Sequence, residues 1–569
     1  MAFILTPERD LQTMNGLHLN GQDSLVQPLL MDFYQLNMCY GYWKSGTHLD
    51  LACFDLFFRK NPFGGEFTVF AGLEDCLRFT QSFRFSKSDM DFIKEKVPHA
   101  EPAFFEYLEK LDCSELKIYA IKEGTVVFPR VPLLTVEGPL ALCQLLETIF
   151  LNLVNYASLV ATNAARFRQV AGERVELLEF GLRRAQGPNG GLSASKYCYA
   201  GGFDATSNLL AGKLFGIPVK GTQAHSFISS FGCEEDLQNK MLKAKDGSRC
   251  VDLLQLSQQK IKMLMDKIEW GISQAEISVG ELVAFCAYAI AFPNTFLALI
   301  DTYDVLRSGA INFCAVALAM HDLGYRVLGC RIDSGDLSYL SKEIRSRFKK
   351  IAALDPKQLQ WVAHLTIVAS NDINEETIVS LNEQQHEINS FGVGTHLVTC
   401  QRQPALGCVY KLVTKSGMPK IKLSQDVVKV TIPGRKQCYR LYGKAGFAIL
   451  DLMLTEDEPA PKANTNILCR HPFEESKRAM VIPAKVEKLQ LEFWDGKEII
   501  QPLPTLDKIR QHVHESISDL RGDHKRILNP TPYKVKCTEC HVDKVSVSER
   551  LYNFLHTLWL QNAPVGQLE

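Results

Sequence analysis

The sequence lacks an excess of charge of either sign. Lysine and arginine number 63 against 64 for aspartate and glutamate, so the formal net charge is −1 over 569 residues. Proteins that bind nucleic acid or anionic membranes usually carry a basic face or a basic tail. The balance therefore gives no electrostatic reason to expect nucleic acid or a membrane as a partner, and it leaves room for local anion sites.

Long uncharged runs are also scarce. One run, residues 282–300, is long enough to consider as a membrane span, but Pro293 and Asn294 interrupt it. Because proline removes a backbone donor and ends a helix, the run predicts a helix over 279–291 and a strand over 296–300. The N-terminal MAFILTPERD contains too short an apolar stretch for a signal peptide. We expect neither a membrane span nor a secretory leader.

A disulfide framework is not expected, although cysteine is not rare. The 17 cysteines are odd in number and lie among apolar neighbours, for example Cys143, Cys286 and Cys314. This pattern is typical of reduced, buried thiols. It predicts a reducing compartment, the cytosol.

A CTECH segment near the C-terminus, with Cys537, Cys540 and His541, matches the spacing of a haem attachment site. Such an attachment needs a secretory route that the N-terminus does not provide. A structural tail is the default interpretation, and a metal-binding pair is the alternative.

The common nucleotide-binding loops are missing. No Gly-Lys pair is preceded by the earlier glycine of a Walker loop, and Gly392 and Gly394 lack the third glycine of a Rossmann fingerprint. With Thr395 these two glycines instead predict a general phosphate cradle, since glycine lets backbone N–H groups approach an anion.

What is present is a regular succession of apolar runs, each ending in polar or glycine residues and followed by a helical pattern. Such a succession predicts a parallel sheet covered by helices, with a barrel favoured. The carboxyl ends of the strands form the active site in open and closed α/β folds alike, so we expect the functional residues there. The six runs are 175–180, 217–219, 296–300, 326–332, 365–369 and 388–391.

The flanking regions have shorter strands and more turns, which indicates a separate α+β region. We divide the chain into a flexible arm (1–24), an α+β sandwich region (25–170), an α/β barrel (171–400), returning strands (401–456) and a C-terminal extension (457–569). The returning strands are expected to complete the first sheet. The barrel is expected to contain a charged, helical insert at about 233–271, and the extension a helix over 506–521.

The strand tails carry residues with strong binding chemistry. The tail arginines Arg183, Arg184 and Arg331 can pair bidentately with carboxylates or phosphates, or form structural salt bridges. Two D-x-x-D pairs suit Mg²⁺-bound oxyanions or a structural network; they are Asp301, Asp304, Asp333 and Asp336.

Two further tail residues have nucleophilic chemistry. His225 is a candidate base, metal ligand or nucleophile, and Lys220 a candidate for a Schiff base or for phosphate binding. Together the tails predict an enzyme that acts on phosphorylated and carboxylated small molecules with a divalent cation.

Seven segments in this order resemble the nicotinate phosphoribosyltransferase family of the eukaryotic type, over about residues 25–452. They are MDFYQLNM (31–38), FGLRRAQGPNGG (180–191), GTQAHSF (221–227), FLALIDTYDVLRSG (296–309), RIDSGDL (331–337), ASNDI (369–373) and FGVGTHL (391–397).

The resemblance implies a type II phosphoribosyltransferase fold, in which an irregular α/β barrel packs against an α+β sandwich domain, here with a C-terminal extension. It implies a homodimer with sites near the subunit boundary. It also implies ATP-coupled phosphoribosyl transfer from phosphoribosyl pyrophosphate to nicotinate with Mg²⁺ or Mn²⁺, as the first step of NAD synthesis from nicotinic acid.

By position, the resemblance also implies roles for single residues. His225 corresponds to a histidine that ATP phosphorylates, and Asp301 and Asp333 face the sugar. Asp336 is a candidate metal ligand. The nicotinate site comprises Tyr34, from the neighbouring subunit, with Thr222, Phe180, Arg331 and, as a second choice for the carboxylate, Arg183. The phosphoribosyl pyrophosphate site comprises Gly392, Gly394, Thr395, Ser370 and Asn371.

Four alternatives stay open. One is a secreted or surface-acting ligand, which needs no catalysis and would be tested by a role for the insert at about 233–271. A related enzyme that uses nicotinamide would need an acidic group facing the amide, and a quinolinate-using enzyme would need a decarboxylation site. A barrel that binds a metabolite without catalysis is an alternative from another functional class.

Overall fold

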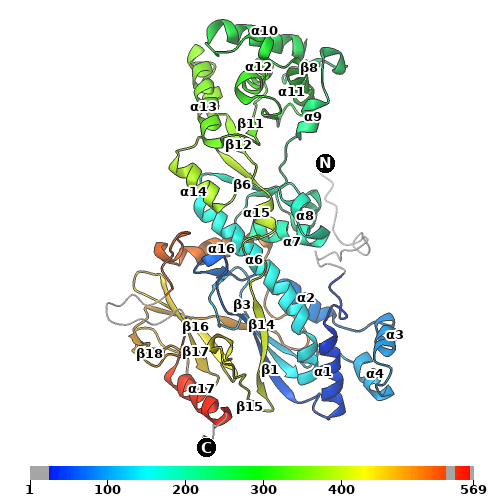
Figure 1. The fold of residues 1–569 in the computed structure, drawn as a ribbon, viewed down its shortest axis with the longest axis vertical. Coiled ribbons are helices and arrows are strands. Elements are labelled where there is room, and N and C mark those ends of the chain that lie inside the picture. The colour runs from blue at the N-terminus through cyan, green and yellow to red at the C-terminus, as the bar shows by residue number, and fades with distance from the viewer. Residues whose placement is uncertain (1–24, 534–544, 564–569) are drawn as a thin grey trace, which may run out of the picture.

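The computed structural model describes residues 25–533 and 545–563, which form an elongated molecule with an antiparallel sandwich at one end and a parallel barrel at the other (Figure 1). None of the helices in these two stretches combines the length and apolar character of a membrane span. The CTECH segment lies outside the described residues.

The first sheet has six antiparallel strands in the order β15-β14-β1-β5-β3-β21. Strand β1 pairs on one side with β5 and on the other with β14, which comes from far along the chain. The strands are β1 (Leu51–Phe58), β3 (Lys117–Ile121), β5 (Leu134–Pro139), β14 (Cys408–Lys415), β15 (Met418–Pro419) and β21 (Gln490–Trp494).

Helices cover this sheet, and one of them joins it to the barrel. Helix α6 (Glu147–Ala171) runs through the middle of the molecule (Figure 1) and buries almost every side chain from Ala157 to Arg168. The other helices are α1 (Phe33–Lys44), α2 (Leu73–Ser82), α3 (Lys87–Lys96), α4 (Pro102–Glu109) and α5 (Leu140–Leu145), and a small ladder joins β2 (Thr68–Val69) to β4 (Val126–Val127).

The second sheet is the predicted parallel sheet, in the order β10-β11-β12-β13-β6-β7. Its strands are short and end where the polar tails begin. They are β6 (Glu176–Glu179), β7 (Ala205–Thr206), β10 (Leu297–Leu299), β11 (Gly329–Ile332), β12 (Thr366–Ala369) and β13 (Ser390–Val393).

The barrel is irregular on one side. Val219 forms a single parallel bridge with Thr206, and no backbone ladder among the described residues joins it to β10. The Gln223 side chain spans this gap: with its amide oriented to satisfy both partners, Nε2 donates to the Leu297 carbonyl at 3.0 Å and Oε1 accepts from Leu299 N at 3.1 Å. The expected fold, an irregular α/β barrel packed against an α+β sandwich, is confirmed.

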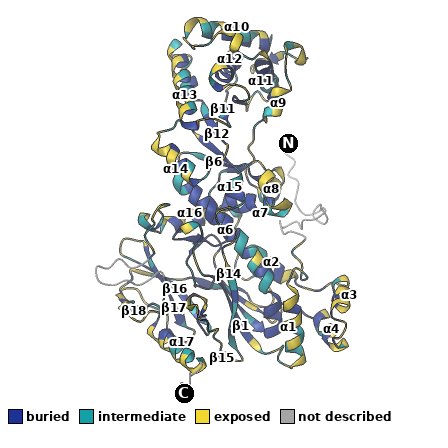
Figure 2. Ribbon diagram, viewed as in Figure 1, coloured by how far each residue is buried: buried dark blue, intermediate teal, exposed yellow. Residues whose placement is uncertain are grey.

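Helices surround the parallel sheet. They are α7 (Gly187–Ala200), α8 (Leu209–Phe215), α9 (His225–Ser229), α10 (Leu253–Lys267), α11 (Val279–Ala291), α12 (Ala310–Asp322), α13 (Leu337–Leu354), α14 (Glu375–Glu383) and α15 (Thr395–Val398). Those at the surface, such as α10 and α13, have their exposed residues on the outside (Figure 2). The predicted helix over 279–291 is thus confirmed.

The sequence predicts a helical insert over 233–271, and this expectation is only partly right. The insert begins with a short 3₁₀ turn (Glu234–Asp236), continues as a hairpin of β8 (Met241–Lys243) and β9 (Cys250–Asp252), and has one α-helix, α10. The reason is the Asp246-Gly247 pair: Gly247 adopts φ +77°, and Asp246 accepts from the Ser248 backbone, as hairpin turns require. Helix α10 packs against α11 and α12, so the segment belongs to the outer layer of the barrel.

A third sheet, in the order β19-β18-β22-β17-β16-β20, corrects the expectation for the returning strands. Of the strands within 401–456, only β14 and β15 join the first sheet, and β21 of the extension joins its other edge. Strands β16 and β17 pair with each other, because a buried bidentate ion pair between Arg440 and Asp451 joins them and the C-terminal extension supplies their neighbours. The members are β16 (Lys436–Tyr442), β17 (Ala448–Thr455), β18 (Ile467–Arg470), β19 (Arg478–Val481), β20 (Lys485–Lys488) and β22 (Val545–Val547), and α17 (Glu549–Asn562) packs on them.

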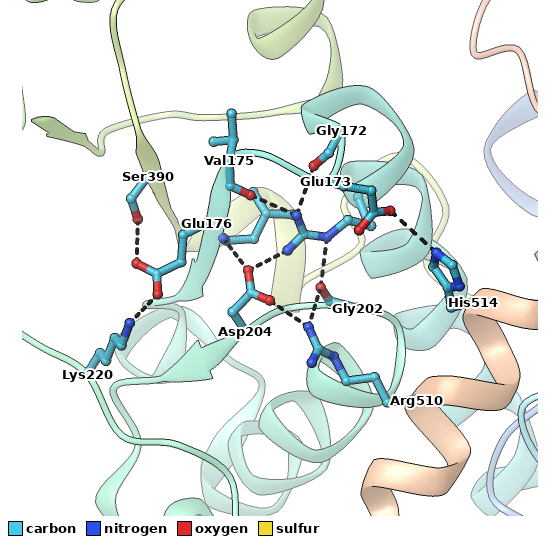
Figure 3. Close-up of polar contacts among 12 residues, drawn as sticks. Gly172, Glu173, Val175, Glu176, Gly202, Asp204, Lys220, Ser390, Arg510 and His514 are labelled. Atoms are coloured by element: carbon cyan, nitrogen blue, oxygen red, sulfur yellow. Dashed lines mark hydrogen bonds and ion pairs between the residues drawn. The ribbon is translucent and has the colours of Figure 1, made fainter. Parts of the chain in front are cut away.

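The extension also reaches the barrel through α16 (Leu506–Ser518), close to the predicted helix. Asp204, just before β7, lies between two guanidinium groups: Arg168 Nη2 lies 2.5 Å from Oδ2 and Arg510 Nη2 lies 2.6 Å from Oδ1. Figure 3 shows Asp204 and Arg510 facing each other. Leu177 N also donates to Asp204, and both arginines donate to the Gly202 carbonyl. This cluster fastens α16 to the start of the barrel sheet.

Replacing Arg510 by alanine is expected to lower the free energy of unfolding by about 1–3 kcal/mol, since a charge-assisted hydrogen bond is lost while Asp204 keeps Arg168. Urea unfolding followed by circular dichroism measures the change. Lys508→Ala, on the exposed face of the same helix, is the matched control. Equal effects of the two substitutions would mean that the ion pair adds nothing measurable.

Candidate active site

Six of the predicted site residues meet where the tails of β10, β11, β12 and the loop after Val219 converge. They are His225, Asp301, Asp333, Arg331, Thr222 and Ser370. The carboxyl ends of parallel strands lie at one edge of a sheet, which is why residues so distant in the chain come together. The cluster is the candidate active site.

His225 begins α9 and remains 44% exposed in its side chain. Its Nδ1 lies 3.1 Å from Thr302 Oγ1, and its Nε2 lies 3.6 Å from Asp333 Oδ2 and 4.0 Å from Asp301 Oδ1. An accessible imidazole held between a hydroxyl and two carboxylates suits proton transfer or nucleophilic attack.

Asp301 is nearly inaccessible, with 1% of its side chain exposed. One carboxylate oxygen accepts from Asp333 N at 2.9 Å and from Ser334 Oγ at 2.6 Å, which ties the tail of β10 to that of β11. The other oxygen, Oδ1, is buried without a hydrogen-bond partner in the described part of the chain. That oxygen is the one that faces His225.

Arg331 points its guanidinium group into the same cluster. Nη1 donates to Thr222 Oγ1 at 2.8 Å, Nε donates to Ser370 Oγ at 2.8 Å, and Nη2 lies 3.1 Å from Asp333 Oδ1. The group also lies 5.7 Å from the centre of the Phe180 ring. A cation held in this way beside an aromatic face suits a flat, carboxylated ring.

Asp333 is held in its ionised form. Partial burial pushes the pKa of the carboxyl upward, but the Arg331 guanidinium and a hydrogen bond from Ser370 outweigh burial and hold that pKa below its usual range. The carboxylate therefore keeps its negative charge between Arg331 and His225 at neutral pH.

The predicted phosphate cradle lies beside this cluster. A Cβ on Gly392 would lie 2.5 Å from the Phe180 ring and 3.4 Å from Ser370 Cβ, so only glycine fits there. Gly394 and Thr395 open the short helix α15, and Asn371, with φ +87°, follows Ser370 in a left-handed conformation. Non-glycine residues adopt that conformation rarely, and such residues cluster at functional sites.

Three predicted residues lie apart from the cluster. Arg183 is exposed in a 3₁₀ turn (Leu182–Arg184) and makes no hydrogen bond or ion pair that the described residues reveal. Asp336 caps α13 by accepting from Tyr339 N at 3.0 Å. Tyr34, on α1, is 45% exposed and lies on the sandwich (Figure 1), away from the strand tails of its own chain.

Sequence reasoning missed three residues that complete the site: Thr302, Gln223 and Ser334. Each directly follows a predicted site residue in the chain. Its position in a strand tail could therefore have identified it as a site residue. Lys220, the candidate for a Schiff base, instead pairs with Glu176 at the start of β6 (Figure 3).

An accessible histidine, paired carboxylates and a half-buried arginine at the strand tails of an irregular parallel barrel define a class of protein: α/β-barrel enzymes that act on anionic small molecules. Family models place the chain within that class. Models described as the nicotinate phosphoribosyltransferase N-terminal domain, family and C-terminal domain match residues 29–155, 297–443 and 435–555.

The chain is similar to curated proteins along its whole length. It is 67% identical to nicotinate phosphoribosyltransferase of Caenorhabditis elegans, with 100% of both chains covered. It is 46% identical to the human protein of that name, with 90% of this chain and 95% of the relative covered.

A solved structure supports the same relation. The crystal structure of human nicotinic acid phosphoribosyltransferase superimposes with a TM-score of 0.82 at 44% identity, over 93% of this chain and 100% of that chain. A nicotinate-nucleotide pyrophosphorylase from Pyrococcus furiosus, with a TM-score of 0.57 and 19% identity over 86% of this chain and 95% of that chain, shares the fold. The chain belongs to the nicotinate phosphoribosyltransferase family and is an enzyme.

Proposed function

We propose that this protein transfers the phosphoribosyl group of phosphoribosyl pyrophosphate to nicotinate, giving nicotinate mononucleotide and pyrophosphate, and that ATP hydrolysis drives the transfer through phosphorylation of His225. The observation that carries the proposal is the cluster in which Arg331, Asp333, Asp301 and His225 meet at the strand tails. It combines a carboxylate-binding cation with an accessible nucleophile.

Nicotinate differs from nicotinamide by its carboxylate, and Arg331 is the group that binds it. Arg331 already donates to Thr222 and Ser370, so its position is fixed before a ligand arrives. The Phe180 ring offers one face to the pyridine. Arg183, exposed on its turn, is the second choice for the carboxylate or a ligand of the phosphate.

A second copy of the chain supplies the opposite face of the pyridine site. Tyr34 lies on the sandwich. Phe33 and Met38 of the same helix, and Leu30 just before it, are also exposed. Such a group of exposed apolar side chains is typical of an interaction surface. A homodimer covers this surface and brings Tyr34 to the strand tails of the partner subunit.

Phosphoribosyl pyrophosphate binds through its 5′-phosphate to the cradle of Gly392, Gly394 and Thr395, with Ser370 and Asn371 beside it. The first step breaks the bond between C1′ and the pyrophosphate oxygen, and the pyridine nitrogen forms the new bond to C1′. Because positive charge develops on the sugar, the carboxylates of Asp301 and Asp333 stabilise the transition state electrostatically. No general base is needed, since the pyridine nitrogen is already a nucleophile.

ATP acts by phosphorylating the imidazole of His225. A ring nitrogen forms a bond to the γ-phosphorus while the bond from that phosphorus to the bridging oxygen of ADP breaks, and water later releases phosphate. The added negative charge lies next to Asp333 and Asp301, so the phosphorylated and free states differ electrostatically at the site of the sugar.

The donor set fits Mg²⁺ or Mn²⁺, which commonly binds one or two carboxylates together with substrate phosphates. Asp336 would hold the ion, since one of its oxygens caps α13 and the described residues give the other oxygen no hydrogen bond. When bound, the ion neutralises the leaving pyrophosphate. We place the enzyme in the cytosol, in keeping with the free cysteines of the described residues, most of which are buried.

The test is turnover of labelled nicotinate against labelled nicotinamide, with phosphoribosyl pyrophosphate and Mg²⁺, with and without ATP. We expect nicotinate mononucleotide, formed faster with ATP. Product from nicotinamide alone would favour the related activity, and product from neither substrate in a folded sample would favour a non-catalytic barrel.

A further inference from the structure

A buried carboxyl group behind the active site belongs to no step described so far. Glu281 lies on α11 with 0% of its surface exposed. Its Oε2 accepts from Ser308 Oγ at 2.5 Å and from Asn312 Nδ2 at 3.1 Å. Ser308 in turn accepts from Ser278 N at 2.9 Å. The four residues form one buried network between α11 and the start of α12.

This network anchors an unusual turn. Residues Val305–Gly309 form a π-helical turn between the tail of β10 and α12, a conformation that is rare and frequent at functional sites. Ser308 lies within it. A Cβ on the next residue, Gly309, would lie 1.9 Å from the Ile300 carbonyl oxygen, so the turn is pressed against the last residue before Asp301.

The turn therefore determines where Asp301 and Thr302 lie. These two residues follow Ile300 directly, and both face His225: Thr302 Oγ1 contacts Nδ1, and Asp301 Oδ1 approaches Nε2. A displacement of the turn would move both partners of the imidazole at once.

Two oxygens of the network, and one oxygen of Asp301, receive no hydrogen bond from the described residues. They are Glu281 Oε1, Asn312 Oδ1 and Asp301 Oδ1, all of them buried. A proton on Glu281 removes a buried negative charge that would be repelled by the carboxylates of Asp301 and Asp304. In agreement, burial is the main cause that raises the pKa of Glu281 from 4.5 to about 7; Ser308 and Asn312 oppose the rise, and Asp301 and Asp304 add to it.

We propose that Glu281 is a positioning residue for His225: its protonated carboxyl group holds Ser308 and the π turn, and through them holds Asp301 and Thr302 against the imidazole. The proposal rests on the phosphorylation of His225 proposed above. Loss of the proton adds a buried negative charge that Asp301 repels, which loosens the turn, so His225 phosphorylation decreases as pH rises through about 7.

The test compares Ser308→Ala and Glu281→Gln with wild type. Ser341→Ala is the matched control, since Ser341 is a fully buried serine on the neighbouring helix α13 that accepts from a backbone N–H. The measurement is the initial rate of phosphate incorporation from γ-labelled ATP between pH 5.5 and pH 8.5.

We expect Ser308→Ala to lower the rate about tenfold and Ser341→Ala to leave it nearly unchanged, because small misplacements of reacting groups are costly. Glu281→Gln, which cannot ionise, should keep most of the rate near pH 6 and lose the decrease on the alkaline side. Equal rates for Ser308→Ala and Ser341→Ala, or an alkaline decrease that survives in Glu281→Gln, would overturn the proposal.

Wild-type enzyme that incorporates no phosphate would refute the coupling through His225, not the role of Glu281. The role of Glu281 is then decided by a crystal structure of Ser308→Ala. We expect the contact of 3.1 Å between His225 Nδ1 and Thr302 Oγ1 to lengthen by about 0.5 Å or more. An unchanged contact would overturn the proposal.

Discussion

Replacing His225 by alanine is expected to reduce phosphate incorporation from ATP to background and to abolish the stimulation of nicotinate turnover by ATP. The imidazole is the accessible nucleophile of the site, with Thr302 on one nitrogen and two carboxylates near the other. Removing it takes away the only exposed imidazole that the described residues place in this cluster, and with it the nitrogen that would form the bond to phosphorus. Gel analysis after incubation with γ-labelled ATP, together with rates with and without ATP, measures both effects.

Transfer without ATP should persist in this variant, because the pyridine nitrogen and the leaving pyrophosphate do not require the imidazole. His514→Ala, which removes an exposed histidine of α16 far from the strand tails, is the matched control and should behave as wild type. Incorporation and stimulation that survive in His225→Ala would show that the phosphorylated residue is another one.

Replacing Arg331 by alanine is expected to raise the KM for nicotinate far more than the KM for phosphoribosyl pyrophosphate. Loss of a buried, charge-assisted contact to a carboxylate costs about 2–4 kcal/mol, which corresponds to roughly 30- to 1,000-fold in affinity. Arg331 is 13% exposed in its side chain and already fixed by Thr222 and Ser370, so it has little freedom that a ligand would need to restrict. Steady-state kinetics with each substrate varied in turn measure the two constants.

Arg183→Ala is the comparison for this prediction, since Arg183 is exposed and was the second choice for the carboxylate. Arg331→Lys adds a further test, because an ammonium group keeps the charge but cannot donate in the bidentate geometry of a guanidinium group. An equal increase in both constants for Arg331→Ala would assign Arg331 to a structural or phosphate-binding role. A larger nicotinate effect in Arg183→Ala would assign the carboxylate to Arg183.

The tails of the barrel strands were predictable because their signals are local. An apolar run followed by polar residues predicts a strand end wherever it lies in the chain, and parallel strands bring their ends to one edge. His225, Asp301, Arg331 and Asp333 were found in this way. The helix over 279–291 was predicted for the same reason, since Pro293 ends it within a few residues.

Other features depend on partners far away in the chain. The pairing of β16 with β17 and β20, rather than with the first sheet, follows from neighbours supplied by the C-terminal extension and from the buried Arg440–Asp451 pair. The hairpin within 233–271 had a local signal, Asp246-Gly247, which the charged and helical character of the segment obscured.

The sequence by itself determined the class of fold, the strand tails and the residue types that carry charge at the site, because hydrophobic periodicity and turn chemistry act over short distances. Only the tertiary structure decided which charges meet. It placed Arg331 between Thr222, Ser370 and Asp333, and it set Glu281 behind the turn that holds Asp301 and Thr302. It also left Asp301 Oδ1 beside His225 with no hydrogen-bond partner among the residues that the structure describes. Electrostatic and hydrogen-bond energies depend on distance and burial, and these quantities exist only after distant segments have packed together.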